Sequence, residues 1–223
     1  MLSVADDRQD GPLEALRFAV IEADLVASHF REIIRLNAST TGLAEVRRQF
    51  QTADVLHFAC HGQTNHEHPL ESGLSVARDG DLILRELLEF PPGRHRLALL
   101  AGCETAFVSL SSLHRGVSLT SGFLVAGCQA VAASLWVLPD WCSALVLCRM
   151  LDVWAASPGS LAAALRVAQL WLRDTSWAEK LAYLRANEHT QVKLQFATAL
   201  EALEERPSTN HPFYWAGYRI TGS

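Results

Sequence analysis

The chain has 223 residues, 49% of them hydrophobic and 19% charged, with a formal net charge of −5. This length and apolar content suffice for one sizeable buried core, and the composition excludes long disordered stretches. Lysine and arginine are few and scattered, which excludes an extended basic surface, so we expect no direct nucleic-acid binding.

The N-terminal part of the chain has a helical pattern. Apolar side chains recur at steps of three or four over residues 12–35, which predicts an amphipathic helix. We therefore assign residues 1–36 to an N-terminal helix that packs on the domain, and residues 37–223 to the domain itself. A short helix after residue 42 follows, for which Thr41 is a suitable cap.

Short apolar runs later in the chain predict the strands of a sheet. Three continuous runs are typical of strands buried on both faces: residues 54–60, 96–102 and 129–137. Asp79-Gly80 predicts the turn of a hairpin, and the aromatic residues of 213–220 predict a last strand. Helices are predicted between them: residues 85–89, 116–126, 140–156 with Asp140 as cap, 160–173 and 176–205. This alternation predicts an α/β fold with a mainly parallel central sheet and helices on both faces.

Cysteine usage and hydropathy bear on the compartment. The five cysteines are odd in number, and four of them lie in apolar runs: Cys60, Cys128, Cys142 and Cys148. Buried free thiols in a reducing compartment explain this better than disulfides, so we expect a cytoplasmic protein. The uncharged run between Arg115 and Asp140 is long enough for a membrane span, but glycine, serine and glutamine interrupt it, so we expect no membrane association.

Two predicted strand ends carry residues with catalytic chemistry. One buried run ends at His61-Gly62, and another ends at Gly102-Cys103. If these strands are parallel neighbours, both side chains reach one crevice beyond the carboxyl ends of the sheet. An imidazole beside a thiol can take its proton and later protonate a leaving amine. Gly62 has no side chain, so its backbone N–H can closely approach a substrate carbonyl.

Several segments around these residues occur in the order and spacing of a known family. They are ADVLHFACHG, in which His57 and His61 form His-x-x-x-His-Gly, then ESGL, DGDLILREL, LALLAGCETA, GFLVAGCQAVAASLWVLPD, SLAAALRVAQLWL and HPFYWAGYRITG. They resemble the CHAT domain, a branch of the caspase-like cysteine peptidases, from about residue 37 to the end. The resemblance implies a three-layer caspase-like fold. Ala101-Gly102-Cys103 departs from the family's usual Ser-Ala-Cys, so substrate access or activation is expected to differ.

The resemblance implies a cysteine endopeptidase that cleaves a protein substrate without a cofactor or metal. His61 would be the general base and Cys103 the nucleophile, and the N–H groups of Gly62 and Cys103 would form the oxyanion hole. Trp136 and Asp140 would line the substrate pocket, where a buried carboxylate favours a basic residue before the cut. Asp140 is equally suited to a plain helix cap. The family also implies regulation by an upstream or partner module, of tetratricopeptide-repeat or sensor type.

The same residues fit other interpretations. The chain could keep the fold as a catalytically inactive interaction or scaffold module, or hydrolyse a non-peptide acyl bond. Cys103 could be a small core residue, and His57 is interpreted as a supporting or core histidine inside its strand. The histidines from His57 to His95 lack the ligand spacing of a zinc site, so no metal is expected.

Overall fold

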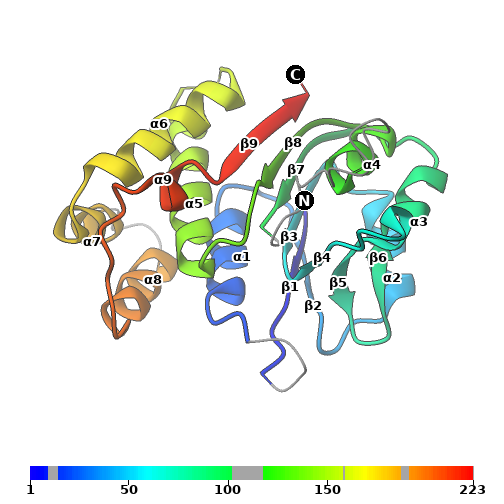
Figure 1. Cartoon of the computed structure of the whole chain (residues 1–223), viewed down its shortest axis with the longest axis horizontal. Coiled ribbons are helices and arrows are strands. Elements are labelled where there is room, and N and C mark those ends of the chain that lie inside the picture. Colours follow the sequence, from blue (N-terminus) through cyan, green and yellow to red (C-terminus); the bar gives the residue numbers. More distant parts are fainter. Residues whose placement is uncertain (10–14, 102–117, 158, 187–190, 223) are drawn as a thin grey trace.

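A computed structural model describes residues 1–9, 15–101, 118–157, 159–186 and 191–222. In these residues a six-stranded sheet of order β2-β1-β3-β7-β8-β9 runs through the middle of the molecule, beside a three-stranded sheet of order β4-β5-β6 (Figure 1). The strands are β1 (Leu2–Ala5), β2 (Ile34–Asn37), β3 (Val55–Ala59), β4 (Gly62–Gln63), β5 (Gly73–Ala77), β6 (Gly80–Ile83), β7 (His95–Leu100), β8 (Cys128–Ser134) and β9 (Tyr218–Gly222). All pairings in the larger sheet are parallel except that of β8 with β9. The predicted mainly parallel α/β fold is confirmed.

Helices cover both faces of the large sheet. They are α1 (Ala19–Ala27), α2 (Leu43–Phe50), the 3₁₀ helix η1 (Pro69–Glu71), α3 (Leu84–Glu89), α4 (Leu119–Val125), α5 (Asp140–Ala156), α6 (Leu161–Asp174), α7 (Trp177–Ala186), α8 (Gln191–Glu201) and α9 (Pro212–Trp215). Helices α1 and α5 to α8 lie on one side of the sheet, and α2 to α4 with the small sheet lie on the other (Figure 1). None of the described helices is both long enough and apolar enough to cross a lipid bilayer.

Alternation along the central strands explains their continuous apolar sequence. In β7, Leu97 and Leu99 pack into the core on the α1 and α5 side, whereas Ala98 and Leu100 pack into the core on the α2 to α4 side. Successive side chains of a strand point to opposite faces, so a strand covered on both faces must be apolar at nearly every position. This makes the runs that predicted β3, β7 and β8 recognisable in the sequence.

The prediction of one helix over residues 12–35 is wrong. Helix α1 occupies only Ala19–Ala27, and strands β1 and β2 flank it and pair with each other in parallel. Each strand has only four residues, too few to show a period, and pairing with β1 overrides the helical pattern of the residues after α1. The boundary drawn after residue 36 falls inside β2, so residues 1–36 contribute strands to the same sheet as the rest of the chain.

Two smaller predictions also change. The turn between β5 and β6 consists of Arg78 and Asp79, and Gly80 already belongs to β6. The Asp79 carboxylate accepts a 2.7 Å hydrogen bond from the Leu43 N–H at the start of α2, where no side chain of Thr41 caps the helix. Residues 213–220 divide between the short helix α9 and strand β9, because Pro212 favours the first turn of a helix.

A carboxylate on α5 holds the helical layer together. Asp152 accepts hydrogen bonds from His29 Nε2 at 2.8 Å, from the Tyr183 hydroxyl of α7 and from Lys193 Nζ of α8. Burial acts to raise the pKa of Asp152, but these three donors outweigh it and hold that pKa well below its usual range. The charged carboxylate therefore stabilises the packing of α5 against α7, α8 and the residues that follow α1.

We expect Asp152→Asn to lower the free energy of unfolding by roughly 1–3 kcal/mol at pH 7, because a half-buried charged acceptor of three hydrogen bonds is lost. A carboxyl with a lowered native pKa stabilises the fold above its unfolded pKa of about 4 and loses this effect as the pH falls through the native pKa. The difference from the unsubstituted chain should therefore shrink between pH 5 and pH 3, roughly the range over which the unfolded carboxyl titrates, measured by urea unfolding.

Asp174→Asn removes the same charge from an exposed carboxylate that pairs with Arg173, and serves as the control that should leave unfolding unchanged. If Asp152→Asn lowers the free energy of unfolding by the same amount at pH 5 and at pH 3, the role assigned to the charge is wrong.

Candidate active site

The pairing of β3 with β7 sets the candidate site. These strands are parallel neighbours, and Phe58 of β3 is paired with Leu100 of β7. The pairing continues one residue further, because the Ala101 N–H donates a 3.0 Å hydrogen bond to the Phe58 carbonyl. His61 follows the end of β3 at this carboxyl edge of the sheet. The condition set in the sequence analysis, that the two strands be parallel neighbours, is met; Gly102 and Cys103 lie outside the described residues.

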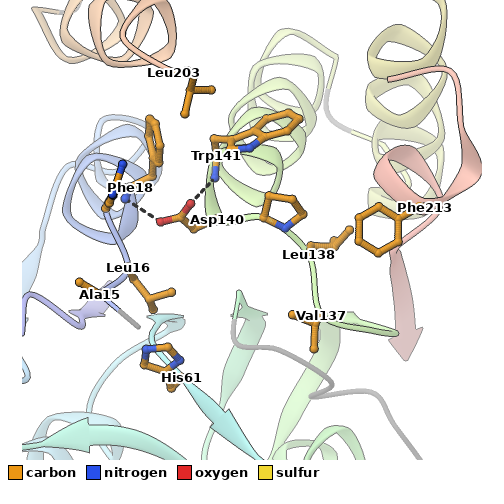
Figure 2. A pocket seen from close by; sticks show the side chains of 12 residues that line it. Ala15, Leu16, Phe18, His61, Val137, Leu138, Asp140, Trp141, Leu203 and Phe213 are labelled. Atoms are coloured by element: carbon orange, nitrogen blue, oxygen red, sulfur yellow. Dashed lines mark hydrogen bonds between the residues drawn. The ribbon is translucent and has the colours of Figure 1, made fainter. Parts of the chain in front are cut away.

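His61 lies at a cavity of about 590 Å³ at this edge (Figure 2). One wall is the segment of residues 15–18 that leads into α1, and another is the segment of residues 137–141 that leads into α5. Leu203 and Phe213 complete the described lining. Most of this lining is apolar, and its charged members among the described residues are Asp140 and Arg17.

Asp140 lies at the middle of the cavity wall and joins two elements. Its carboxylate accepts 2.9 Å hydrogen bonds from the Phe18 N–H at the start of α1 and from the Trp141 N–H of α5, drawn as dashed lines in Figure 2. Burial raises the pKa of Asp140, although the backbone donors and the charge of Arg17 act in the opposite direction. The N-cap position of α5 is Pro139, so Asp140 is the first helical residue and not a plain cap.

Trp136 contributes to the cavity indirectly, by holding the backbone of Phe213. Its indole N–H donates a 2.9 Å hydrogen bond to the carbonyl of Phe213, whose ring lines the cavity, while Trp136 is not among the described lining residues. Val137 and Phe213 are 54% and 39% exposed, so two large apolar side chains face solvent beside the cavity.

The pairing of β4 with β5 does not use the N–H of Gly62. The Ser75 N–H donates a 2.9 Å hydrogen bond to the His61 carbonyl, and Gly62 is the partner of Leu74 in the antiparallel pairing of β4 with β5. Hydrogen-bonded pairs alternate with non-bonded pairs in such a ladder, so the Gly62 N–H points away from β5. Since β4 is an edge strand of the small sheet, this N–H takes no part in the hydrogen bonds between its strands.

His57 is a buried structural residue. Its ring is fully buried, with Nδ1 3.0 Å from the Ser3 hydroxyl of β1 and Nε2 3.0 Å from Glu22 Oε1 of α1. This agrees with the interpretation of His57 as a supporting or core histidine. Sequence reasoning missed Ser3 and Glu22; an acidic residue inside the otherwise apolar start of α1 was the available signal.

The four described cysteines are free and buried, as predicted from their apolar surroundings. Burial raises the pKa of Cys128 and Cys148 to about 12, and it raises the pKa of Cys60 and Cys142 as well. These thiols are protonated near neutral pH and are poor nucleophiles. No group of three or more histidine, cysteine or acidic side chains in the described part of the chain could hold a metal ion.

The mainly parallel sheet, covered by helices on both faces and carrying His61 beyond the end of β3, defines a caspase-like α/β protein. The model of the CHAT domain family matches residues 3–223, and the chain belongs to this family. CHAT domains are related to the caspase-like cysteine peptidases. The match begins well before residue 37, where the resemblance was expected to start, because β1, α1 and β2 belong to the domain. A search of the curated proteins finds no match.

Replacing Asp140 tests its contact with α1. We expect Asp140→Ala to lower the free energy of unfolding by about 1–3 kcal/mol, because two backbone N–H groups lose a largely desolvated acceptor. The Phe18 amide should also exchange with deuterium faster, as measured by mass spectrometry or NMR. Asp54→Ala, which removes an exposed carboxylate that pairs with Arg96, is the matched control. Unchanged exchange at Phe18 would show that the carboxylate does not hold this segment.

Proposed function

We propose that this chain is a cysteine endopeptidase in which His61 is the general base and Cys103 is the nucleophile. The observation that carries the proposal is the register of β3 and β7. Phe58 and Leu100 are paired in adjacent parallel strands, and His61 and Cys103 each follow one member of this pair by three residues in the sequence. Equal offsets from a paired position favour side chains that meet at the same edge of the sheet. Membership of the CHAT family gives independent support.

The proposed reaction needs only groups of this chain, a peptide and water. The imidazole of His61 takes the thiol proton, and the Cys103 sulfur attacks the carbonyl carbon of the scissile bond. The Gly62 N–H, which the β4–β5 ladder leaves available, supports the role of an oxyanion donor together with the Cys103 N–H. The protonated imidazole then delivers its proton to the leaving amine, and water hydrolyses the acyl-enzyme.

We propose further that the cavity beside His61 receives the substrate side chain that precedes the cut. Its apolar walls suit the aliphatic part of a long side chain, and Asp140 suits a basic end group, against which the charge of Arg17 in the same lining acts. Each Asp140 oxygen accepts one backbone hydrogen bond and keeps a lone pair for a substrate donor. Trp136 belongs to this site indirectly, through the position of Phe213.

The proposal also covers the cellular compartment and the regulation of the protein. The buried free thiols support a reducing compartment such as the cytoplasm. Family membership supports regulation by a partner of tetratricopeptide-repeat or sensor type, so generic peptides are expected to be cleaved slowly by the chain alone. Rapid cleavage by the purified chain would contradict the need for a partner.

Alkylation by iodoacetamide at pH 7 tests the catalytic pair. We expect Cys103 to be modified selectively, because the four described thiols are buried and have raised pKa values. His61→Ala should slow the modification of Cys103 about tenfold or more, since the thiol then has an ordinary pKa. Peptide mass spectrometry of the digested chain measures both effects.

His68→Ala is the matched control, because His68 lies in the exposed loop that follows β4 and is not part of the cavity. It should leave the rate of Cys103 modification unchanged. If Cys103 of the unsubstituted chain reacts no faster than Cys103 of His61→Ala, the chain is better described as a catalytically inactive interaction module with the CHAT fold.

A further inference from the structure

The segment that carries His61 is held at both ends by backbone hydrogen bonds. The Asp6 N–H donates to the Ala59 carbonyl at 2.8 Å, just after the end of β1. The Ser75 N–H of β5 donates to the His61 carbonyl at 2.9 Å. The residues between β3 and β4 are therefore fixed from the large sheet on one side and from the small sheet on the other.

Arg8 joins these two attachment points. Its Nε donates to Asp6 Oδ1 at 2.7 Å, and its Nη2 donates to Asp6 Oδ2 at 2.5 Å. The same Nη2 donates to the Ser75 carbonyl at 3.1 Å. Asp6 and Ser75 are only 3% and 6% exposed, whereas the Arg8 side chain is 31% exposed, so the acceptor groups are shielded from water and the guanidinium is only partly so. A bidentate pair with a buried carboxylate is better defined in geometry than a pair between two exposed side chains.

Ser75 is itself constrained on its remaining side. Its hydroxyl donates a 2.9 Å hydrogen bond to Asp81 Oδ1 of β6, while its N–H binds His61 and its carbonyl accepts from Arg8. All three polar groups of Ser75 are therefore bonded to different elements. A shift of the Arg8 side chain would be transmitted to the Ser75 backbone and from there to the His61 carbonyl.

We propose that Arg8 is a positioning residue for His61, resting on the proposed role of His61 as general base. Its guanidinium binds both the Asp6 carboxylate and the Ser75 carbonyl, and thereby fixes the position of His61 at the carboxyl edge of β3 and β7. Arginine is required because its planar fork binds both carboxylate oxygens and the carbonyl at once. A lysine at position 8 keeps the charge but offers a single ammonium group, so it can hold only part of this arrangement.

The test measures the rate of Cys103 alkylation by iodoacetamide between pH 5 and pH 10 in Arg8→Lys and Arg8→Gln. We expect the rate at pH 7 to fall about tenfold in Arg8→Gln, with the midpoint of the pH profile moving toward that of an ordinary thiol. Arg8→Lys should fall between Arg8→Gln and the unsubstituted chain. Arg48→Gln removes a guanidinium from a comparable bidentate pair with Glu45 on the surface of α2, and should change nothing.

Deuterium exchange at the Ser75 amide gives a readout that does not depend on activity. We expect this amide to exchange at least tenfold faster in Arg8→Gln than in the unsubstituted chain. An unchanged pH profile with unchanged exchange at Ser75 overturns the proposal. If Arg8→Gln does not fold, Arg8→Lys supplies the same comparison with the charge retained.

The outcomes separate this inference from the proposed function. If His61→Ala alkylates as fast as the unsubstituted chain, the proposed function fails, and faster Ser75 exchange in Arg8→Gln would still establish the clamp on the His61 segment. If His61→Ala is slow but Arg8→Gln and Arg8→Lys match the unsubstituted chain, the proposed function stands and the positioning role of Arg8 fails.

Discussion

The structure depends most on the parallel pairing of β3 with β7, two strands buried on both faces. The pairing fixes where each strand ends relative to the other, because a shift of one residue would turn every core side chain to the opposite face. Leu99 and Leu100 belong to different cores on opposite sides of the sheet, so such a shift would disrupt both at once. The register of the two strands also determines where the segments that follow them begin. Side chains in those segments can therefore be placed at the same edge of the sheet.

Elements that are far apart in the sequence surround this edge. Residues before α1 supply one wall of the cavity, and the residues that lead into α5 supply another, joined by the Asp140 carboxylate. The small sheet holds the other side through Ser75 and the His61 carbonyl. Because these supports come from separate elements, the candidate site depends on the folding of the whole domain and not on one loop.

The sequence alone predicted the parts of the fold that follow local rules. Continuous apolar runs indicated β3, β7 and β8, and the long helix α5 was predicted with its observed end at Ala156 and its start within one residue. The position of His61 at the end of a strand followed from the same pattern. Strand β1 escaped detection because four residues have no measurable period, and its identity as a strand depends on its neighbours β2 and β3. The hydrogen bond between Asp140 and Phe18 joins residues 122 positions apart, and no local pattern reveals such a contact.

The place of β1 between β2 and β3 has a consequence for the solubility of shortened forms. A chain that lacked residues 1–9 would leave β3 without its partner on the side that faces β1. The backbone N–H and C=O groups on that side, flanked by apolar side chains, would then form an open sheet edge. Such an edge can pair with another copy of itself. The first strand, though only four residues long, therefore also protects the molecule from aggregation.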